Sequence, residues 1–341
     1  MRRAPPSLPK HQRGALLILL VIALGILAAT VFVSMLSSSQ IQIDRDKKTA
    51  AALAEAKASV LGYAITNQRT PGGLPFPDRN GDGNYDGNGD CYNRVVSPSL
   101  LLGELPYLNE VGCYPVVSAF NTLPLDAGGE RLWVAISSNL LRSNNGNYPV
   151  INTSTLMANA GWFTVSDGTG LILSNHVAFV LLAPGGVLTG QSRSGNAPNP
   201  QNFLDDFTVG ASIYQNWNML NPLGFITTNP VNNAANHFND SLLYVTRDEL
   251  ISRLVDRIAG EIRLGLNIYY QTNHTYPATL TSIATSLPSW FNTNSWTTDT
   301  VYTLMTPNQA TIGFQGCTGS TFTITWNSTT QQSDMLRNGP C

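Results

Sequence analysis

The first pattern in the chain is an apolar run near its amino terminus. Gly14 to Leu36 covers 23 residues without a charged side chain. As a helix rising 1.5 Å per residue, this run would reach roughly 35 Å, enough to cross a hydrocarbon core of about 30 Å. The preceding residues 1–13 carry four basic side chains and no acidic ones, so we expect them to stay in the cytoplasm. A secretory signal peptide is the alternative, although its apolar region normally has only about 7–15 residues.

The helical pattern continues beyond the apolar run. Ser37 to Asn67 contains no proline, its only glycine is Gly62, and it is rich in alanine, which is the strongest helix former. Apolar residues recur at helical spacing in its second half, at Leu53, Ala56, Val60 and Tyr63. The pattern therefore predicts one rod over residues 14–67, with an amphipathic second half that packs against a folded head.

Short apolar runs separated by turns follow the rod, and they predict strands of a sheet. The clearest are Leu132 to Ile136, Trp162 to Val165 and Val177 to Ala183. Two polar stretches rich in Gly, Asn and Pro, Gly190 to Pro200 and Asn229 to Asn239, have little to bury, so we expect surface loops there.

A second amphipathic helix is predicted after residue 245. Thr246 and Glu249 have the spacing of a capping box, and apolar residues from Ile251 to Tyr269 then recur on one face. Three short β-prone runs follow, at Val301 to Met305, Ala310 to Phe314 and Thr321 to Trp326, and they predict an antiparallel meander.

These elements predict an α+β fold. A long amino-terminal helix, transmembrane and then amphipathic, would precede a globular head with antiparallel β-sheets and a second amphipathic helix. The expected segments are a basic leader (1–13), the transmembrane and periplasmic rod (14–67), a β-rich head (68–240), and the second helix with a carboxyl-terminal meander (241–341).

Composition and charge narrow the function classes. The chain is 43% hydrophobic, which supports a core, but only 12% charged, about half the usual fraction of soluble proteins. The formal net charge of −2 provides no field that would hold nucleic acid. We therefore expect a secreted type of surface and no nucleic-acid partner.

The four cysteines are Cys91, Cys113, Cys317 and Cys341. They form no CxxC pair or Cys/His cluster of the kind that a zinc site needs, so disulfides in an oxidising compartment fit better. Four cysteines allow three connectivities. A bridge from Cys317 to Cys341 would tie the carboxyl-terminal tail to the meander, and Cys91 would then pair with Cys113.

The segment from Asp78 to Asp90 is a candidate Ca²⁺ loop. Its start matches the D-x-N-x-D-G pattern, in which hard oxygen ligands converge on the ion and glycine permits a sharp turn. The candidate ligands are Asp78, Asn80, Asp82, Asn84, Asp86 and Asp90. The twelfth loop position is Gly89 rather than Glu and no helix flanks the loop on each side, so it is not a true EF-hand. A flexible polar turn is the alternative, because Asn, Asp and Gly favour turns for backbone reasons alone.

The sequence offers few residues in the arrangements that catalysis needs, and we expect no enzyme. His11, His176, His237 and His274 are isolated, and the sequence has neither a G-x-S-x-G elbow nor a phosphate-binding loop. Asp205 and Asp206 are adjacent carboxylates, a pattern typical of a solvated turn.

The amino-terminal region resembles the type IV pilin and pseudopilin family of prepilins. The resemblance rests on the basic leader, the Gln12-Arg13-Gly14-Ala15 join, the apolar run and the continuing amphipathic helix. It implies cleavage after Gly14 by the prepilin peptidase and methylation of the new amino terminus on Ala15. Major pilins carry Glu at the fifth mature position, where this chain has Leu19. Some minor subunits, notably the tip subunit of type II secretion pseudopili, resemble this chain in lacking it.

The end of the second helix also resembles a pilin. Tyr269 to Pro277 is similar to the phrase that closes the long helix of many pilins, and Tyr63 to Asn67 repeats its Tyr-to-Asn spacing. The chain would then contain a second pilin-like module without a membrane segment. The alternative, to which we give equal weight, is that two amphipathic helices share this Tyr-to-Asn spacing at their ends by coincidence.

The resemblance implies a minor pilin or pseudopilin-like subunit of a type IV pilus or type II secretion filament, at a tip or initiating position. Its partners would be other pilin subunits, the prepilin peptidase and the inner membrane. It would span that membrane once, with its head in the periplasm, before entering the filament. The alternative is a singly anchored periplasmic or surface adhesin that never enters a filament.

Overall fold

The computed structural model describes residues 12–79, 85–91, 101–111, 120, 123–141, 149–193, 199–233 and 235–341. It divides the chain into two compact units, Met1–Lys48 and Thr49–Cys341. Helix and antiparallel sheet together make an α+β fold, as the sequence predicted.

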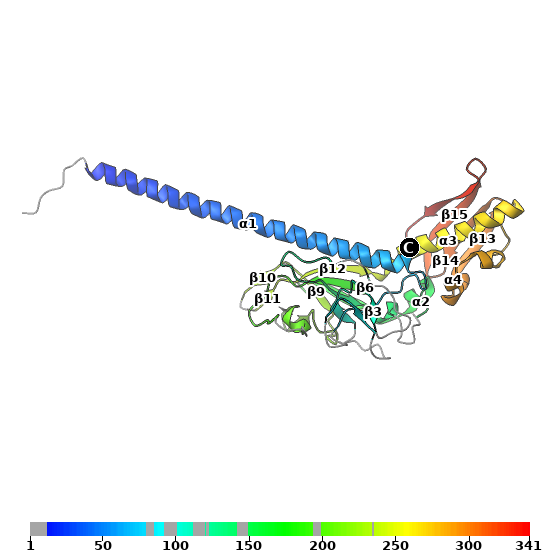
Figure 1. Cartoon of the computed structure of the whole chain (residues 1–341), viewed down its shortest axis with the longest axis horizontal. Coiled ribbons are helices and arrows are strands. Elements are labelled where there is room, and N and C mark those ends of the chain that lie inside the picture. Colours follow the sequence, from blue (N-terminus) through cyan, green and yellow to red (C-terminus); the bar gives the residue numbers. More distant parts are fainter. Residues whose placement is uncertain are drawn as a thin grey trace, which may run out of the picture. The chain divides into compact units, whose positions relative to one another are not determined.

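The predicted rod is a single helix, α1 (Gln12–Thr66), labelled in Figure 1. Side chains of residues 12–39, apart from Leu24, lie outside the described set, and the predicted membrane span Gly14 to Leu36 falls within this stretch. Within the described residues, no helix combines the length and apolar character that crossing a bilayer requires.

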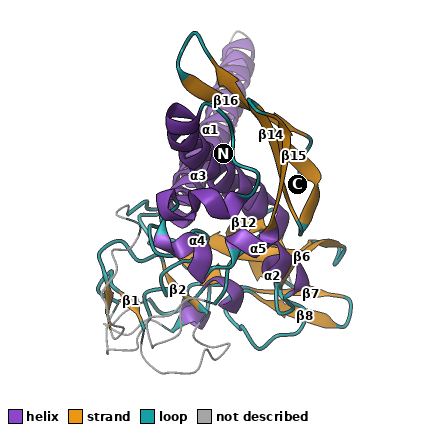
Figure 2. Ribbon diagram, turned by 90° about the vertical axis from the view of Figure 1, so that its right-hand side faces the viewer, coloured by secondary structure: helices purple, strands orange, loops and turns teal. Residues whose placement is uncertain are grey.

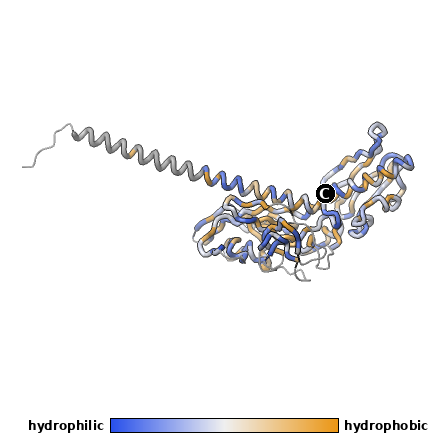
Figure 3. Tube along the Cα trace, in the orientation of Figure 1, coloured by the Kyte–Doolittle hydropathy of each residue, from blue (hydrophilic) through white to orange (hydrophobic). Residues whose placement is uncertain are grey.

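From Thr49 onward α1 belongs to the second unit and buries one face there. The buried side chains, spaced three or four residues apart, are Ala52, Leu53, Ala56, Val60 and Ala64. Hydrophobic and hydrophilic positions are interspersed along this part of the helix (Figure 3). The predicted amphipathic second half of the rod is therefore confirmed.

The first sheet has six strands, whose bounds are β2 (Leu102–Glu104), β4 (Trp133–Ile136), β5 (Phe163–Asp167), β6 (Ile172–Ala183), β9 (Phe225–Thr227) and β12 (Ser241–Thr246). The order is β2-β4-β6-β5-β9, and β12 pairs with β6. All pairs are antiparallel except β5 with β9. The carboxyl-terminal half of β6 is continuously buried, because its side chains enter two hydrophobic clusters, and β4 and β12 pair with its two edges.

Helix α3 (Arg247–Asn273) begins directly after β12, and its Thr246 cap is confirmed. The Thr246 Oγ1 accepts the Glu249 N–H at 3.1 Å. The Glu249 carboxylate does not complete the predicted capping box. It forms an ion pair with Lys57 of α1 instead, with Nζ 2.9 Å from Oε1. An aliphatic stripe along α3 is fully buried, and the helix contacts both β6 and the carboxyl-terminal sheet.

The carboxyl-terminal sheet has four antiparallel strands, β13 (Thr300–Thr306), β14 (Gln309–Phe314), β15 (Cys317–Asn327) and β16 (Gln332–Asn338), in sequential order beside α3 (Figure 2). The sequence predicted only the first three. The strand β16 was missed because it is mostly polar and exposed, and only Ser333 in it is buried. One continuous core includes residues of α1, the six-stranded sheet, α3 and this sheet.

The remaining described elements are short. They are β1 (Gly89–Asp90), β3 (Glu110–Val111), β7 (Asp206–Val209), β8 (Ser212–Gln215), β10 (Val231–Asn232), β11 (His237–Phe238), α2 (Thr153–Ala158), α4 (Ser289–Thr293), α5 (Trp296–Asp299) and the 3₁₀ turns Ser138–Leu140, Pro200–Asn202 and Leu280–Ser286. The pair β10–β11 corrects one prediction, because Asn229 to Asn239 forms a small hairpin with a buried Phe238 rather than a loop with little to bury.

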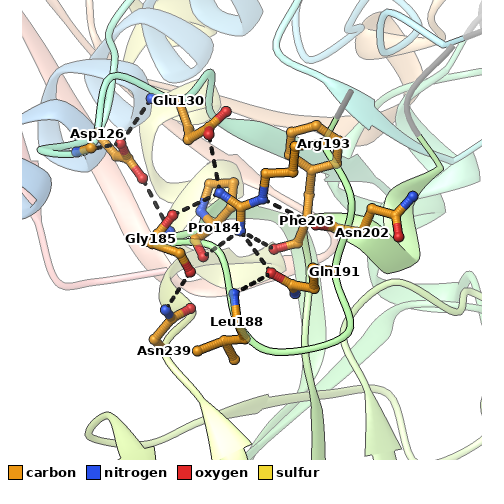
Figure 4. A network of polar contacts seen from close by, with 12 residues as sticks. Asp126, Glu130, Pro184, Gly185, Leu188, Gln191, Arg193, Asn202, Phe203 and Asn239 are labelled. Carbon is orange, nitrogen blue, oxygen red and sulfur yellow. Dashed lines mark hydrogen bonds and ion pairs between the residues drawn. The ribbon is translucent and has the colours of Figure 1, made fainter. Parts of the chain in front are cut away.

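The described residues of the second polar stretch, Gly190 to Pro200, contain no fully buried residue and no strand, as predicted for a surface loop, but one of its side chains is held in place. Within its described residues, the Arg193 side chain is only 6% exposed and forms an ion pair with Glu130 at 3.2 Å. Its guanidinium also donates to the backbone carbonyls of Gly185 at 2.8 Å and Asn202 at 3.0 Å (Figure 4). Arg193 therefore joins its part of this segment to Glu130 and Gly185, which lie just before β4 and just after β6.

Candidate functional site

The predicted Ca²⁺ loop is described in part. Asp78, Asp86 and Asp90 lie in the described residues, whereas Asn80, Asp82 and Asn84 lie outside them. Asp78 and Asp90 are both buried. Two of the six candidate ligands are therefore inside the head, which a flexible polar turn would not require.

Asp78 is fixed by backbone pairing with β2. Its N–H donates to the Glu104 carbonyl at 3.0 Å, and its carbonyl accepts the Glu104 N–H at 2.7 Å. This approach requires glycine at the neighbouring position, because a Cβ at Gly103 would lie 2.1 Å from the Asp78 carbonyl oxygen. The loop returns to the same carboxylate nine residues later, where the Gly87 N–H donates to Asp78 Oδ2 at 2.6 Å.

The other two described aspartates bind backbone donors. Asp90 Oδ2 accepts the Arg79 N–H at 2.9 Å, and Asp86 Oδ1 accepts the Asn88 N–H at 2.9 Å. Within the described residues, Asp78 Oδ1 is buried without a hydrogen-bond partner. A buried carboxylate oxygen without a donor is costly, so this atom is a position in the site that calls for a further ligand.

Two glutamates complete a buried acidic cluster that the sequence reading missed. Glu104 of β2 and Glu110 of β3 are both buried beside the loop. Arg131 compensates part of this charge, because its Nη1 lies 2.8 Å from Glu104 Oε2 and 3.7 Å from Asp78 Oδ2. A charged residue inside the apolar run Leu101-Leu102-Gly103-Glu104-Leu105 was the available signal, but no motif links it to the loop.

The cluster shifts the proton equilibrium of its carboxyl groups. Burial raises the pKa of Asp78 to about 8, and the negative charges of Glu104, Asp90 and Asp86 add to this effect, while the Gly87 hydrogen bond opposes it. Burial also raises the pKa of Glu104, against the Arg131 hydrogen bond and charge. Without a cation the cluster therefore keeps a proton near neutral pH.

The described carboxylates do not by themselves make a metal site. In the described ranges, no group of three or more His, Cys, Asp or Glu side chains is arranged to hold a metal ion. The donors that the D-x-N-x-D pattern would add, Asn80, Asp82 and Asn84, belong to the stretch outside those ranges.

The remaining predicted site residues fall into two groups. A disulfide joins Cys317 to Cys341, which confirms that expected pair. Cys91 is also disulfide-bonded, and its expected partner Cys113 lies outside the described residues. Gly14 and Ala15 lie in α1, where their surroundings are likewise outside the described set.

A second site corrects the prediction of a solvated Asp205-Asp206 turn. Asp206 is exposed and its Oδ1 accepts the Trp217 indole N–H at 2.6 Å, but Asp205 is buried. Asp205 Oδ2 accepts the N–H groups of Asn239 and Asp240, at 2.7 and 3.2 Å, and its own N–H donates to Asp240 Oδ2 at 2.9 Å. Asp240, which is 35 residues away, is the partner that local sequence could not indicate.

The buried pair also holds protons more tightly than ordinary carboxyl groups. Burial raises the pKa of Asp205 to about 6, opposed by its backbone hydrogen bonds. Burial and then the charge of Asp205 raise the pKa of Asp240. Asn216 Nδ2 donates to Asp240 Oδ2 at 3.0 Å, so this oxygen accepts two hydrogen bonds, from Asn216 and from the Asp205 N–H.

Comparisons with known proteins give no relative. No family model matches the chain, and no curated protein and no solved structure is significantly similar to it.

Proposed function

We propose that the chain is a prepilin-like minor subunit of a type IV pilus or type II secretion filament. The observation that carries the proposal is helix α1, which is unbroken from Gln12 to Thr66. Its sequence contains the uncharged run Gly14 to Leu36 after a basic leader, and its last turns bury Ala56, Val60 and Ala64 in the head. One helix thus provides both a segment suited to lipid or a filament core and an attachment to a folded head.

The mechanism is assembly rather than a reaction. Subunits wait in the inner membrane, with their heads in the periplasm, after the prepilin peptidase has cut between Gly14 and Ala15. The apolar parts of their helices then pack together as the filament grows. Leu19 stands where a carboxylate would pair with the free amino terminus of a neighbouring subunit, so this subunit fills one end of the array.

Calcium is the proposed structural ion of the head. Asp78 Oδ1 lacks a hydrogen-bond partner among described residues, and the buried carboxylates around it outnumber the arginines. A Ca²⁺ ion accepts six to eight oxygen ligands, which the alternating Asp and Asn residues of the loop would supply. Bound there, it would replace the proton that Asp78 otherwise keeps.

The adhesin alternative is supported by the size of the head, Thr49–Cys341. Filament fractions distinguish the two functions. The chain should be recovered with filaments sheared from cells, and the Gly14→Leu variant, which blocks cleavage, should stay in the membrane fraction. A matched Gly25→Leu variant in the same apolar run keeps the cleavage join. An adhesin that never enters a filament would remain with the membrane in all three forms.

A further inference from the structure

A cavity whose lining residues are all separate from the acidic cluster has the chemistry of a ligand site. It measures about 590 Å³, within the range of about 300–1,000 Å³ typical of small-molecule pockets. Its walls come from three segments, 188–191, 201–217 and 235–237. The third is the hairpin that the sequence reading had assigned to a loop.

The walls of the cavity are fixed by buried polar contacts. Gln191 Nε2 donates to Asp205 Oδ1 at 2.8 Å, and Gln191 Oε1 accepts the Leu188 N–H at 3.0 Å. Arg193 lies behind this wall, where its guanidinium donates to Gln191 Oε1 at 3.1 Å and to the Asn202 carbonyl at 3.0 Å (Figure 4). A cavity held in this way is largely formed before any ligand arrives, which lowers the entropy cost of binding.

An aromatic residue forms part of the same cavity. Trp217 packs against the core cluster of the sheet and also lines the cavity. Its Nε1–H donates to Asp206 Oδ1 at 2.6 Å, which fixes the orientation of the indole. A fixed indole offers a flat apolar surface against which the C–H groups of a ligand can pack.

Other polar groups that line this cavity remain available. Within the described part of the chain, the side-chain amide of Gln201 makes no hydrogen bond, and Asp206 engages only Oδ1. An amide offers both donors and acceptors, and a carboxylate accepts, so hydroxyl groups can pair with either. The described residues that line the cavity include no Lys or Arg, while two are aspartates, which disfavours phosphate, sulfate or carboxylate ligands.

We propose that this cavity binds a neutral saccharide. A sugar ring presents apolar C–H groups on one face and hydroxyls around its edge, which matches an indole wall flanked by amide and carboxylate groups. Trp217 packs on the ring, and Gln201 and Asp206 bond its hydroxyls. The proposal is independent of filament assembly, because it concerns only residues of the head.

Saturation-transfer NMR with free sugars tests the proposal on the full chain, kept in a zwitterionic detergent without a sugar headgroup. The probes are galactose, glucose, N-acetylglucosamine and N-acetylneuraminic acid. We expect transfer to at least one neutral sugar and none to N-acetylneuraminic acid. Titration of that sugar should show about fivefold to tenfold weaker binding to Gln201→Ala, because a hydrogen bond is lost. Gln68→Ala, an exposed glutamine outside the cavity, should bind like the native chain.

A second variant separates binding from folding. Trp217→Phe keeps an aromatic ring but loses the bond to Asp206 and part of the indole's apolar surface, so it should still fold, with a modestly lower melting temperature, and bind several-fold more weakly. Transfer to none of the neutral sugars would overturn the proposal. The proposal would also be overturned if Gln201→Ala and Trp217→Phe bound the sugar as tightly as the native chain, or if the chain preferred N-acetylneuraminic acid.

Discussion

Asp299 at the end of α5 accepts two hydrogen bonds from Thr153 at the start of α2, from Oγ1 at 2.6 Å and from the backbone N–H at 3.1 Å. The Ser154 N–H donates to the other carboxylate oxygen at 3.0 Å. Both Asp299 and Thr153 are buried. The carboxylate therefore binds the first two N–H groups of α2, whose N-cap is Asn152, and joins the β-rich part of the head to the carboxyl-terminal part, which also share a continuous core.

Replacing this carboxylate should destabilise the whole head. In Asp299→Ala, several buried donors lose their acceptor, and we expect a loss of about 3 kcal/mol in the free energy of unfolding. Because the two parts share a core, melting should remain one cooperative transition in native and variant chains. Asp334→Ala, which removes an exposed carboxylate of β16, should change stability by less than about 0.5 kcal/mol. Two separate transitions in the calorimetric trace would show that the parts fold independently.

Calcium should stabilise the full chain with the weak affinity of extracellular sites, about 10⁻⁴ to 10⁻³ M. An ion that binds the folded state alone raises the free energy of unfolding by RT ln(1 + c/Kd), where c is the Ca²⁺ concentration, so the melting temperature rises with the logarithm of c above Kd. We expect this shift with several millimolar Ca²⁺, measured by thermal melting and calorimetric titration, and its loss in Asp82→Ala. Asp334→Ala should keep the shift. If the native chain shows neither heat nor a shift, the loop is only a polar turn.

The buried Asp205–Asp240 pair should make the head less stable as pH rises. Both native pKa values lie above the ordinary value of 3.8, and that of Asp205 is about 6. The folded chain therefore holds protons that the unfolded chain releases, so this contribution to stability is complete below about pH 4 and is lost as pH rises through the native pKa values. Asp240→Asn cannot ionise at this position, so its loss of stability between about pH 4 and 8 should be smaller than that of the native chain, while the contribution of Asp78 remains in both.

Denaturant unfolding at a series of pH values provides this measurement. Asp206→Asn is the matched comparison, because Asp206 is the exposed neighbour of Asp205 and should leave the pH profile unchanged. A profile of Asp240→Asn that parallels the native one would show that the pair does not control it.

Leu19 predicts a low copy number in filaments. A subunit without the pairing carboxylate can occupy one end of an array but cannot repeat along it. Quantitative mass spectrometry of sheared filaments should find this chain far below the major pilin. Comparable amounts of the two would rule out the tip position, whatever the effect of Leu19→Glu.

The sequence predicted the helices best, because α1 and α3 have long apolar stripes at helical spacing and Thr246 marks the start of α3. It missed the polar strand β16 and the buried roles of Arg193 and Asp205. The two buried roles depend on partners far along the chain, Glu130 for Arg193 and Asp240 for Asp205. A charged residue in a Gly/Asn-rich stretch looks the same in sequence whether it is solvated or buried with such a partner.

The mass of the mature chain tests the central proposal most directly. Intact-mass measurement of the form extracted from membranes should match a chain that begins at Ala15 with one added methyl group. Cells without prepilin peptidase should instead yield the chain with its leader. A mature chain that begins near Ser37 or later would mean that the apolar run is a signal peptide, and it would contradict the account of a prepilin-like subunit.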